Sequence, residues 1–230
     1  VTSNFTHPLN EIAQVFSKET GHRIRVSSSS TGRLYTQIRN GAPFDIFLSA
    51  DRKTPKLLLE QGRAVKGTEF TYATGKLGLW STKSGFIDKN GETLRSLKFR
   101  GLAMANPKFA PYGVAAQETL RKLGLWDQVQ PKLVFGENIA QAFQFVSSQN
   151  AELGFVALSQ IQINRDGALG SYWIVPRSFY TSLDQDAVLL SRAEKSAPAR
   201  ALLDFLKSDV AKKIIQTSGY DLPAANEDIR

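Results

Sequence analysis

Four short stretches of the chain place small, hydroxyl-bearing or amide residues directly before a predicted helix. A helix N-terminus carries unsatisfied N–H groups and a partial positive charge, so it favours anions. Several such termini converging would bind an oxyanion through neutral donors, without the desolvation cost of a buried cation. The stretches are Ser3-Asn4-Phe5-Thr6, Ser27-Ser28-Ser29-Ser30-Thr31-Gly32, Asn106-Pro107-Lys108-Phe109-Ala110-Pro111-Tyr112-Gly113 and Phe135-Gly136-Glu137-Asn138-Ile139.

Each stretch also has a purely structural interpretation. A serine or threonine before a helix most often caps it, Asn4 is typical of turns, and Tyr112 can pack as a loop aromatic. The hydroxyl run at residues 27–31 is less well explained in this way, because one cap needs one oxygen. Arg33 either reaches an anion held there or lies solvated on the helix surface.

Catalytic and metal-binding chemistry finds little support in the sequence. The two histidines, His7 and His22, lie at opposite ends of one predicted helix, with no Ser-His-Asp arrangement and no metal-ligand spacing. The absence of cysteine excludes disulfides and thiolate sites. No dinucleotide or P-loop fingerprint is present. We therefore expect no enzyme, no cofactor and no directly bound metal.

The composition is that of a globular protein with material for two cores. The chain has 230 residues, of which 42% are hydrophobic and 22% charged. Its net charge of +8 comes from scattered lysines and arginines, which argues against nucleic-acid binding. No run approaches the roughly 20 apolar residues that span a bilayer. The first residues are typical of the end of a strand and show no signal-peptide pattern. The sequence therefore does not identify the native N-terminus.

Predicted strands and helices alternate along the chain. This pattern predicts an α/β protein with parallel strands, built as one open sheet or, as we favour, as two lobes. Strands are expected at residues 1–3, 23–27, 44–48, 70–73, 76–81, 100–105, 132–135, 153–156, 172–175 and 186–191. Helices are expected at residues 8–19, 33–39, 53–61, 114–123, 139–148, 197–208 and 209–218.

Six blocks of residues follow one another along the chain in a characteristic order. They are residues 30–38, 41–51 (Gly-Ala-Pro-Phe-Asp-Ile-Phe-Leu-Ser-Ala-Asp), 72–81, 106–113, 153–158 and 218–220. In type and order these blocks resemble the molybdate-binding periplasmic protein family (ModA) of ABC importers. The Gly-Ala-Pro…Ser-Ala-Asp block together with the Pro-Tyr-Gly loop is the most specific part, and the likeness covers nearly the whole chain.

The resemblance implies a bilobal periplasmic-binding-protein fold of type II, with two α/β lobes joined by two crossover strands. Residues 1–82 and 185–230 would form the first lobe and residues 83–184 the second, with the ligand in a cleft between them. The expected oxyanion-binding residues are Ser3, Asn4, Thr31, Tyr112 and Ile139. Hydroxyls would come from Ser3, Thr31 and Tyr112, whereas Asn4 and Ile139 would donate mainly through the backbone.

Two positions depart from the usual family pattern. Many members supply a hydroxyl from a tyrosine where this chain has Ala157, so the chain resembles the branch in which Tyr112 replaces that donor. Thr31 stands where serine is usual, and the register within the serine run leaves Ser30 as an alternative ligand.

The resemblance also implies a function. The protein would capture molybdate or tungstate as its only ligand and deliver it to the membrane permease of a molybdate ABC transporter. It would act as a periplasmic or otherwise extracytoplasmic monomer, free or membrane-anchored, without nucleic-acid partners. The alternatives are a binding protein for another oxyanion such as sulfate, and a cleft enzyme on the same fold.

Overall fold

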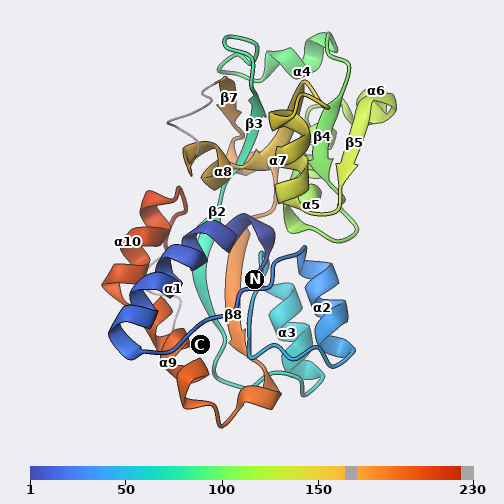
Figure 1. The fold of residues 1–230 in the computed structure, drawn as a ribbon. Helices are drawn as coiled ribbons and strands as arrows, with labels where there is room; N and C mark the ends of the chain where they lie inside the picture. The colour runs from blue at the N-terminus through green and yellow to red at the C-terminus, as the bar shows by residue number, and fades with distance from the viewer. Residues whose placement is uncertain (164–169, 224–230) are drawn as a thin grey trace. The chain divides into compact units, whose positions relative to one another are not determined.

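The computed structural model describes residues 1–163 and 170–223. The chain divides into two compact units (Figure 1). Unit 1 comprises Val1–Thr74 and Asp184–Arg230, and unit 2 comprises Gly75–Leu183. The first boundary thus lies before Gly75 rather than after residue 82, because the strand that follows Gly75 pairs within the sheet of unit 2.

Unit 1 is built on a three-stranded sheet with the order β1-β8-β2, in which β1 is antiparallel to β8. The strands are β1 (Ile46–Leu48), β2 (Phe70–Gly75) and β8 (Leu183–Leu189). The helices are α1 (Thr6–Thr20), α2 (Thr31–Arg39), α3 (Lys53–Glu60), α9 (Ala197–Leu206) and α10 (Asp209–Thr217), with short 3-10 turns η1 (Ser3–Phe5) and η4 (Ser191–Ala193).

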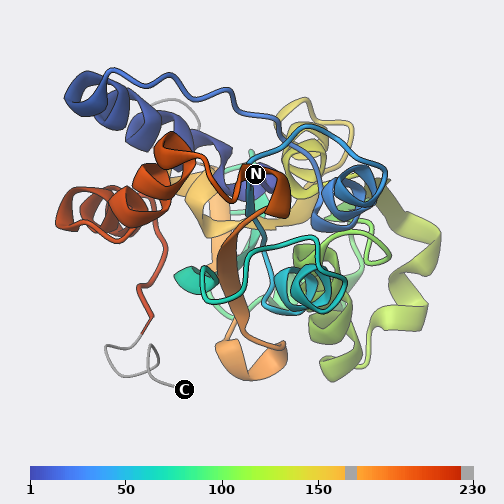
Figure 2. The ribbon, with the colours of Figure 1, turned by 90° about the horizontal axis from the view of Figure 1, so that it is seen from below.

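The alternation of side chains along β8 creates two hydrophobic layers in unit 1. Ala187 and Leu189 pack with α1, α9 and α10, whereas Val188 packs with α2 and α3 on the other face. Figure 2 shows the two groups of helices apart from each other. Helix α1 contributes Leu9, Ile12 and Phe16 at helical spacing and ends at Gly21, whose φ of 75° is the left-handed conformation of a helix C-cap.

Unit 2 is built on a five-stranded mixed sheet with the order β5-β4-β6-β3-β7. Strand β4 is parallel to β5 and β6, whereas β3 is antiparallel to β6 and β7. The strands are β3 (Leu77–Ser81), β4 (Leu102–Ala105), β5 (Leu133–Gly136), β6 (Leu153–Ala157) and β7 (Ser171–Ile174). The helices are α4 (Glu92–Ser96), α5 (Pro111–Lys122), α6 (Trp126–Val129), α7 (Ile139–Ser147) and α8 (Leu158–Ile163), with 3-10 turns η2 (Gln130–Lys132) and η3 (Arg177–Phe179).

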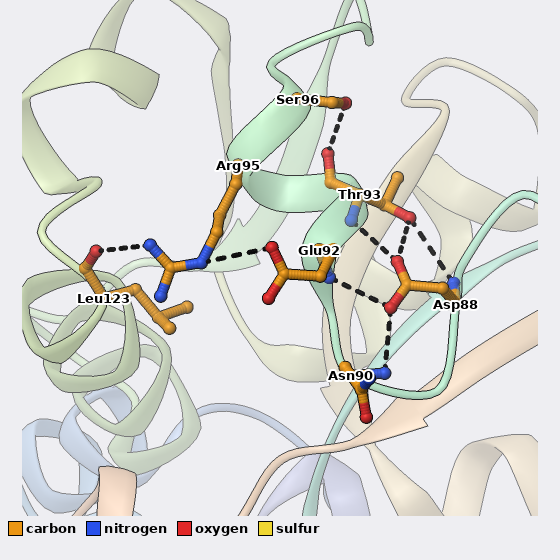
Figure 3. A network of polar contacts seen from close by, with 7 residues as sticks. All are labelled: Asp88, Asn90, Glu92, Thr93, Arg95, Ser96 and Leu123. Carbon is orange, nitrogen blue, oxygen red and sulfur yellow. Dashed lines mark hydrogen bonds and ion pairs between the residues drawn. The ribbon is translucent and has the colours of Figure 1, made fainter.

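The polar segment before α4 is ordered by the carboxylate of Asp88 (Figure 3). This carboxylate accepts hydrogen bonds from the backbone N–H groups of Asn90, Glu92 and Thr93 at 2.8, 3.1 and 2.8 Å, and from the Thr93 hydroxyl at 2.8 Å. Partial burial favours the protonated acid, but these hydrogen bonds outweigh it and lower the pKa of Asp88 below its usual range. The loop is therefore tied together by one charged acceptor.

Three expectations about the strands were wrong. Residues 1–3 form no strand, because Thr2 makes only an isolated bridge and Ser3 begins η1. Residues 23–27 form no strand, although Ile24 and Val26 alternate as they would in a strand. At the end of this segment the Ser27 carbonyl oxygen accepts a hydrogen bond from the Val1 nitrogen at 2.8 Å. Neither sheet is wholly parallel, because β8 runs antiparallel to β1 and β3 runs antiparallel to β6 and β7. Among the described residues, no helix is both long enough and apolar enough to cross a membrane.

Candidate oxyanion-binding site

Unit 1 brings the first two strand-to-helix junctions side by side. Thr2 and Ser29 form a parallel bridge, and the Ser3 N–H donates to the Ser29 carbonyl oxygen at 2.9 Å. Ser3 and Asn4 therefore lie in η1, immediately before α1, while Thr31 begins α2 close by. Three of the five predicted site residues share this region of unit 1.

The N-terminus of α2 lacks a side-chain cap although a serine occupies the capping position. Ser30 is only 3% exposed, and its Oγ has no hydrogen-bond partner within the described parts of the chain. A buried hydroxyl without a partner costs roughly 1–3 kcal/mol. Uncapped N–H groups and an unpaired buried hydroxyl at one helix N-terminus are the features of an oxyanion site.

The Thr31 hydroxyl is held as an acceptor by the protein. Thr31 is 3% exposed, and its Oγ1 accepts a long hydrogen bond from the Ala50 N–H at 3.4 Å. Ala50 follows β1 in a turn that caps α3, since Asp51 accepts from the Thr54 N–H at 2.8 Å. Ala50 was not among the predicted site residues, although its position between a strand and a helix is the same signal that identified the other junctions.

Asn4 has a structural role for its side chain. Its Nδ2 donates to Gln185 Oε1 at 2.9 Å and to the Tyr220 hydroxyl at 3.1 Å, and Asn4 is 3% exposed. The Tyr220 hydroxyl in turn donates to the Asn4 carbonyl oxygen at 2.7 Å. The side-chain amide is thus engaged in the core of unit 1, which leaves the backbone as the part of Asn4 suited to an anion.

Unit 2 brings together the junctions that carry Tyr112 and Ile139. Strands β4 and β5 are parallel neighbours, so the loops at their carboxyl ends meet, and the Asn106 N–H donates to the Gly136 carbonyl oxygen at 2.8 Å. Tyr112 is the second residue of α5 and 1% exposed, and Ile139 is the first residue of α7 and 3% exposed.

The N-terminus of α7 presents backbone donors. Asn138 caps the helix by accepting from the Gln141 N–H at 3.1 Å. The N–H groups of Ile139 and Ala140 lie in the same first turn, where a helix offers no internal acceptor. Helix α5 has no side-chain cap, and it starts so close to β4 that a Cβ on Gly113 would clash with the Ala105 carbonyl oxygen. Glycine at 113 is therefore what lets α5 begin beside the end of β4.

The predicted set has no ionisable acid or base in the neutral pH range and no formal charge. Ser3, Asn4 and Thr31 lie in unit 1, and Tyr112 and Ile139 lie in unit 2. Within residues 1–163 and 170–223, no three His, Cys, Asp or Glu side chains are grouped so as to hold a metal ion. The arrangement can donate hydrogen bonds to an anion, and it contains no nucleophile paired with a base.

Comparison with known proteins places these features in a family. Residues 1–221 match the family model described as "Bacterial extracellular solute-binding protein". The chain is 50% identical over 224 residues to the molybdate-binding protein ModA of Azotobacter vinelandii, covering 96% of this chain and 88% of the relative. It is 47% identical over 220 residues to ModA of Rhodobacter capsulatus, covering 96% of this chain and 86% of the relative.

A solved structure supports the same relationship. The Azotobacter vinelandii periplasmic molybdate-binding protein matches with a TM-score of 0.94 and 41% sequence identity, covering 97% of this chain and 98% of that chain. The alignments run over nearly the whole of this chain and most of each relative.

Proposed function

Because the chain belongs to the ModA family of bacterial extracellular solute-binding proteins, we propose that it captures molybdate and delivers it to the membrane permease of an ABC importer. The observation that carries the proposal is the buried Ser30 hydroxyl at the N-terminus of α2, which has no hydrogen-bond partner among residues 1–163 and 170–223 and does not cap the helix. A bound oxyanion would accept from this group and from the neighbouring N–H groups, and so remove the cost of burying them.

The donor set suits a tetrahedral dianion. Hydroxyl and N–H groups from Ser3, Asn4, Thr31, Tyr112 and Ile139 would surround the oxygens, with Ser30 added from the structure. Backbone N–H groups can only donate, and the Thr31 hydroxyl oxygen already accepts from the Ala50 N–H, so that it is directed to donate to the ligand. Such a site disfavours a partly protonated anion such as phosphate. Sulfate is smaller than molybdate and would leave donors unfilled. Tungstate has the size and charge of molybdate, so it would bind comparably.

One anion would contact donors from both units in this proposal. Unit 1 supplies the Ser3-Asn4 and Ser30-Thr31 junctions, and unit 2 supplies Tyr112 and the N-terminus of α7. A ligand that binds both sets favours the conformation in which they meet, so binding would shift the population toward a closed form. The protein would work as an extracytoplasmic monomer.

Titration calorimetry with molybdate, tungstate, sulfate and phosphate tests this function. We expect binding of one molybdate per chain, with tungstate similar and sulfate and phosphate much weaker. Thr31→Val and Tyr112→Phe each remove one donor to a charged ligand, which costs about 1.5–3 kcal/mol of binding free energy.

The matched controls remove buried hydroxyls elsewhere. Thr119→Val deletes a hydroxyl that donates to the Ala115 carbonyl oxygen within α5, and Tyr180→Phe deletes one that accepts from the Leu77 N–H. Both should leave the affinity unchanged. No heat with molybdate or tungstate in the wild type rejects the function, and unchanged affinity in both site variants rejects the assigned residues.

A further inference from the structure

A continuous chain of buried hydrogen bonds connects the two anion-binding junctions of unit 1. It begins at Asn4, whose Nδ2 donates to Gln185 Oε1 at 2.9 Å. The Tyr72 hydroxyl shares its single hydrogen between this Gln185 oxygen and the Ser49 carbonyl oxygen, each at 3.0 Å. Asn4 and Tyr72 are each 3% exposed and Gln185 is fully buried, so water cannot substitute for these contacts.

The peptide unit between Ser49 and Ala50 connects Tyr72 to Thr31. Its carbonyl oxygen accepts from Tyr72, and its N–H donates to Thr31 Oγ1 at 3.4 Å. Rotation of the peptide plane would weaken both contacts at once. The Tyr72 hydroxyl therefore fixes the orientation of the N–H that meets Thr31.

The direction of the hydrogen bond from the Ala50 N–H to Thr31 Oγ1 determines how the Thr31 hydroxyl can contact an anion. Because Thr31 Oγ1 accepts from Ala50, the hydroxyl hydrogen of Thr31 is left to point away from that N–H. A hydroxyl that accepts from the protein is preset to donate to a ligand. Burial raises the pKa of the Tyr72 phenol well above its usual range, so that Tyr72 remains a donor at any physiological pH.

We propose that Tyr72 is a positioning residue for the oxyanion site: with Gln185 it ties the Asn4 junction to the Thr31 junction and sets the Thr31 hydroxyl as a donor. This inference rests on the proposed function and extends it to residues that do not touch the anion. Tyr72 stands in β2 and Gln185 in β8, the two strands adjacent in the sheet of unit 1.

The ring of Tyr72 serves a separate purpose from its hydroxyl. The ring packs against Phe5 with centroids 4.6 Å apart, directly after the Ser3-Asn4 junction. Tyr72→Phe keeps this packing and removes only the hydroxyl, so the variant should fold. Tyr180→Phe is the matched control, because Tyr180 is a buried tyrosine in unit 2 whose hydroxyl bonds a backbone N–H outside the chain of contacts described here.

A double-mutant cycle in molybdate binding tests the proposal. Tyr72→Phe should weaken binding about tenfold, the equivalent of one net hydrogen bond, and Tyr180→Phe should not change it. In a Thr31→Val background, where the last acceptor is missing, Tyr72→Phe should cost no more than about twofold. Equal losses in both backgrounds, or no loss in the wild-type background, would overturn the positioning role.

Amide hydrogen exchange in the ligand-free protein provides a readout that does not depend on binding. Exchange of the Ala50 amide should accelerate in Tyr72→Phe and in Thr31→Val, and should stay at the wild-type rate in Tyr180→Phe. Unchanged Ala50 exchange in Tyr72→Phe contradicts the proposed chain. A wild type that fails to bind molybdate rejects the function instead, even if Ala50 exchanges as expected.

Discussion

Deleting the Ser30 hydroxyl should change stability and binding in opposite directions. Serine at an N-cap normally stabilises its helix, and its replacement by alanine costs about 1 kcal/mol. Ser30 makes no such capping bond, and its Oγ is buried without a partner in the described residues. Ser30→Ala therefore removes an unsatisfied polar group and no hydrogen bond of the ligand-free protein.

The magnitudes follow from these contacts. Relief of the unsatisfied hydroxyl should raise the free energy of unfolding by about 1 kcal/mol, from the low end of the cost of such groups, and Tm by roughly 2–4 °C. Loss of one hydrogen bond to a charged ligand should weaken molybdate binding by about 1.5–3 kcal/mol. This corresponds to a Kd that rises roughly 10- to 150-fold.

The assay pairs thermal unfolding of the ligand-free protein with titration calorimetry. Ser208→Ala is the matched control, because Ser208 caps α10 by accepting from the Ala211 N–H at 3.2 Å. It should lower the free energy of unfolding by about 1 kcal/mol and leave the affinity unchanged. If Ser30→Ala destabilised the protein like Ser208→Ala and bound molybdate normally, Ser30 would be an ordinary helix cap and not a donor to the anion.

Two further predictions concern the scaffold of unit 2. Asp88→Asn should lower the free energy of unfolding, measured by urea melts, by about 1.5–3 kcal/mol at pH 7. Because the folded-state pKa of Asp88 is below the unfolded value, this deficit should shrink as the pH falls below about 4. The exposed control Asp204→Asn should show no deficit. Gly113→Ala should weaken molybdate binding and lower Tm, because the added Cβ would clash with the Ala105 carbonyl oxygen. Gly101→Ala should be tolerated, because the atom nearest to its added Cβ lies 3.6 Å away. Equal behaviour of the two variants would contradict the close approach of α5 to β4.

The sequence predicted most of the longer elements because their periodicity is local. Helix α1 was expected at residues 8–19 and spans Thr6–Thr20, and α7 was expected at residues 139–148 and spans Ile139–Ser147. The short helices α4, α6 and α8, of four to six residues, were not predicted. Elements this short have too few residues to show a period.

The sequence indicates the parts of the candidate site and not their connections. Ser3, Thr31 and Ile139 are predicted from the strand-to-helix junctions together with the family resemblance, and the structure places each of them at the start of a helix or 3-10 turn. Which junctions adjoin is decided by strand pairing, as between Thr2 and Ser29. The contact of Tyr72 with Gln185 joins residues 113 positions apart, so no local pattern indicates it.

Anomalous diffraction at the molybdenum absorption edge, from crystals grown with molybdate, would locate the bound anion and its donors. We expect one molybdenum peak per chain, with anion oxygens at about 2.7–3.2 Å from the hydroxyls of both Thr31 and Tyr112. A peak held by lysine or arginine side chains, or one that contacts a single unit, would contradict the claim that neutral donors from both units bind one anion.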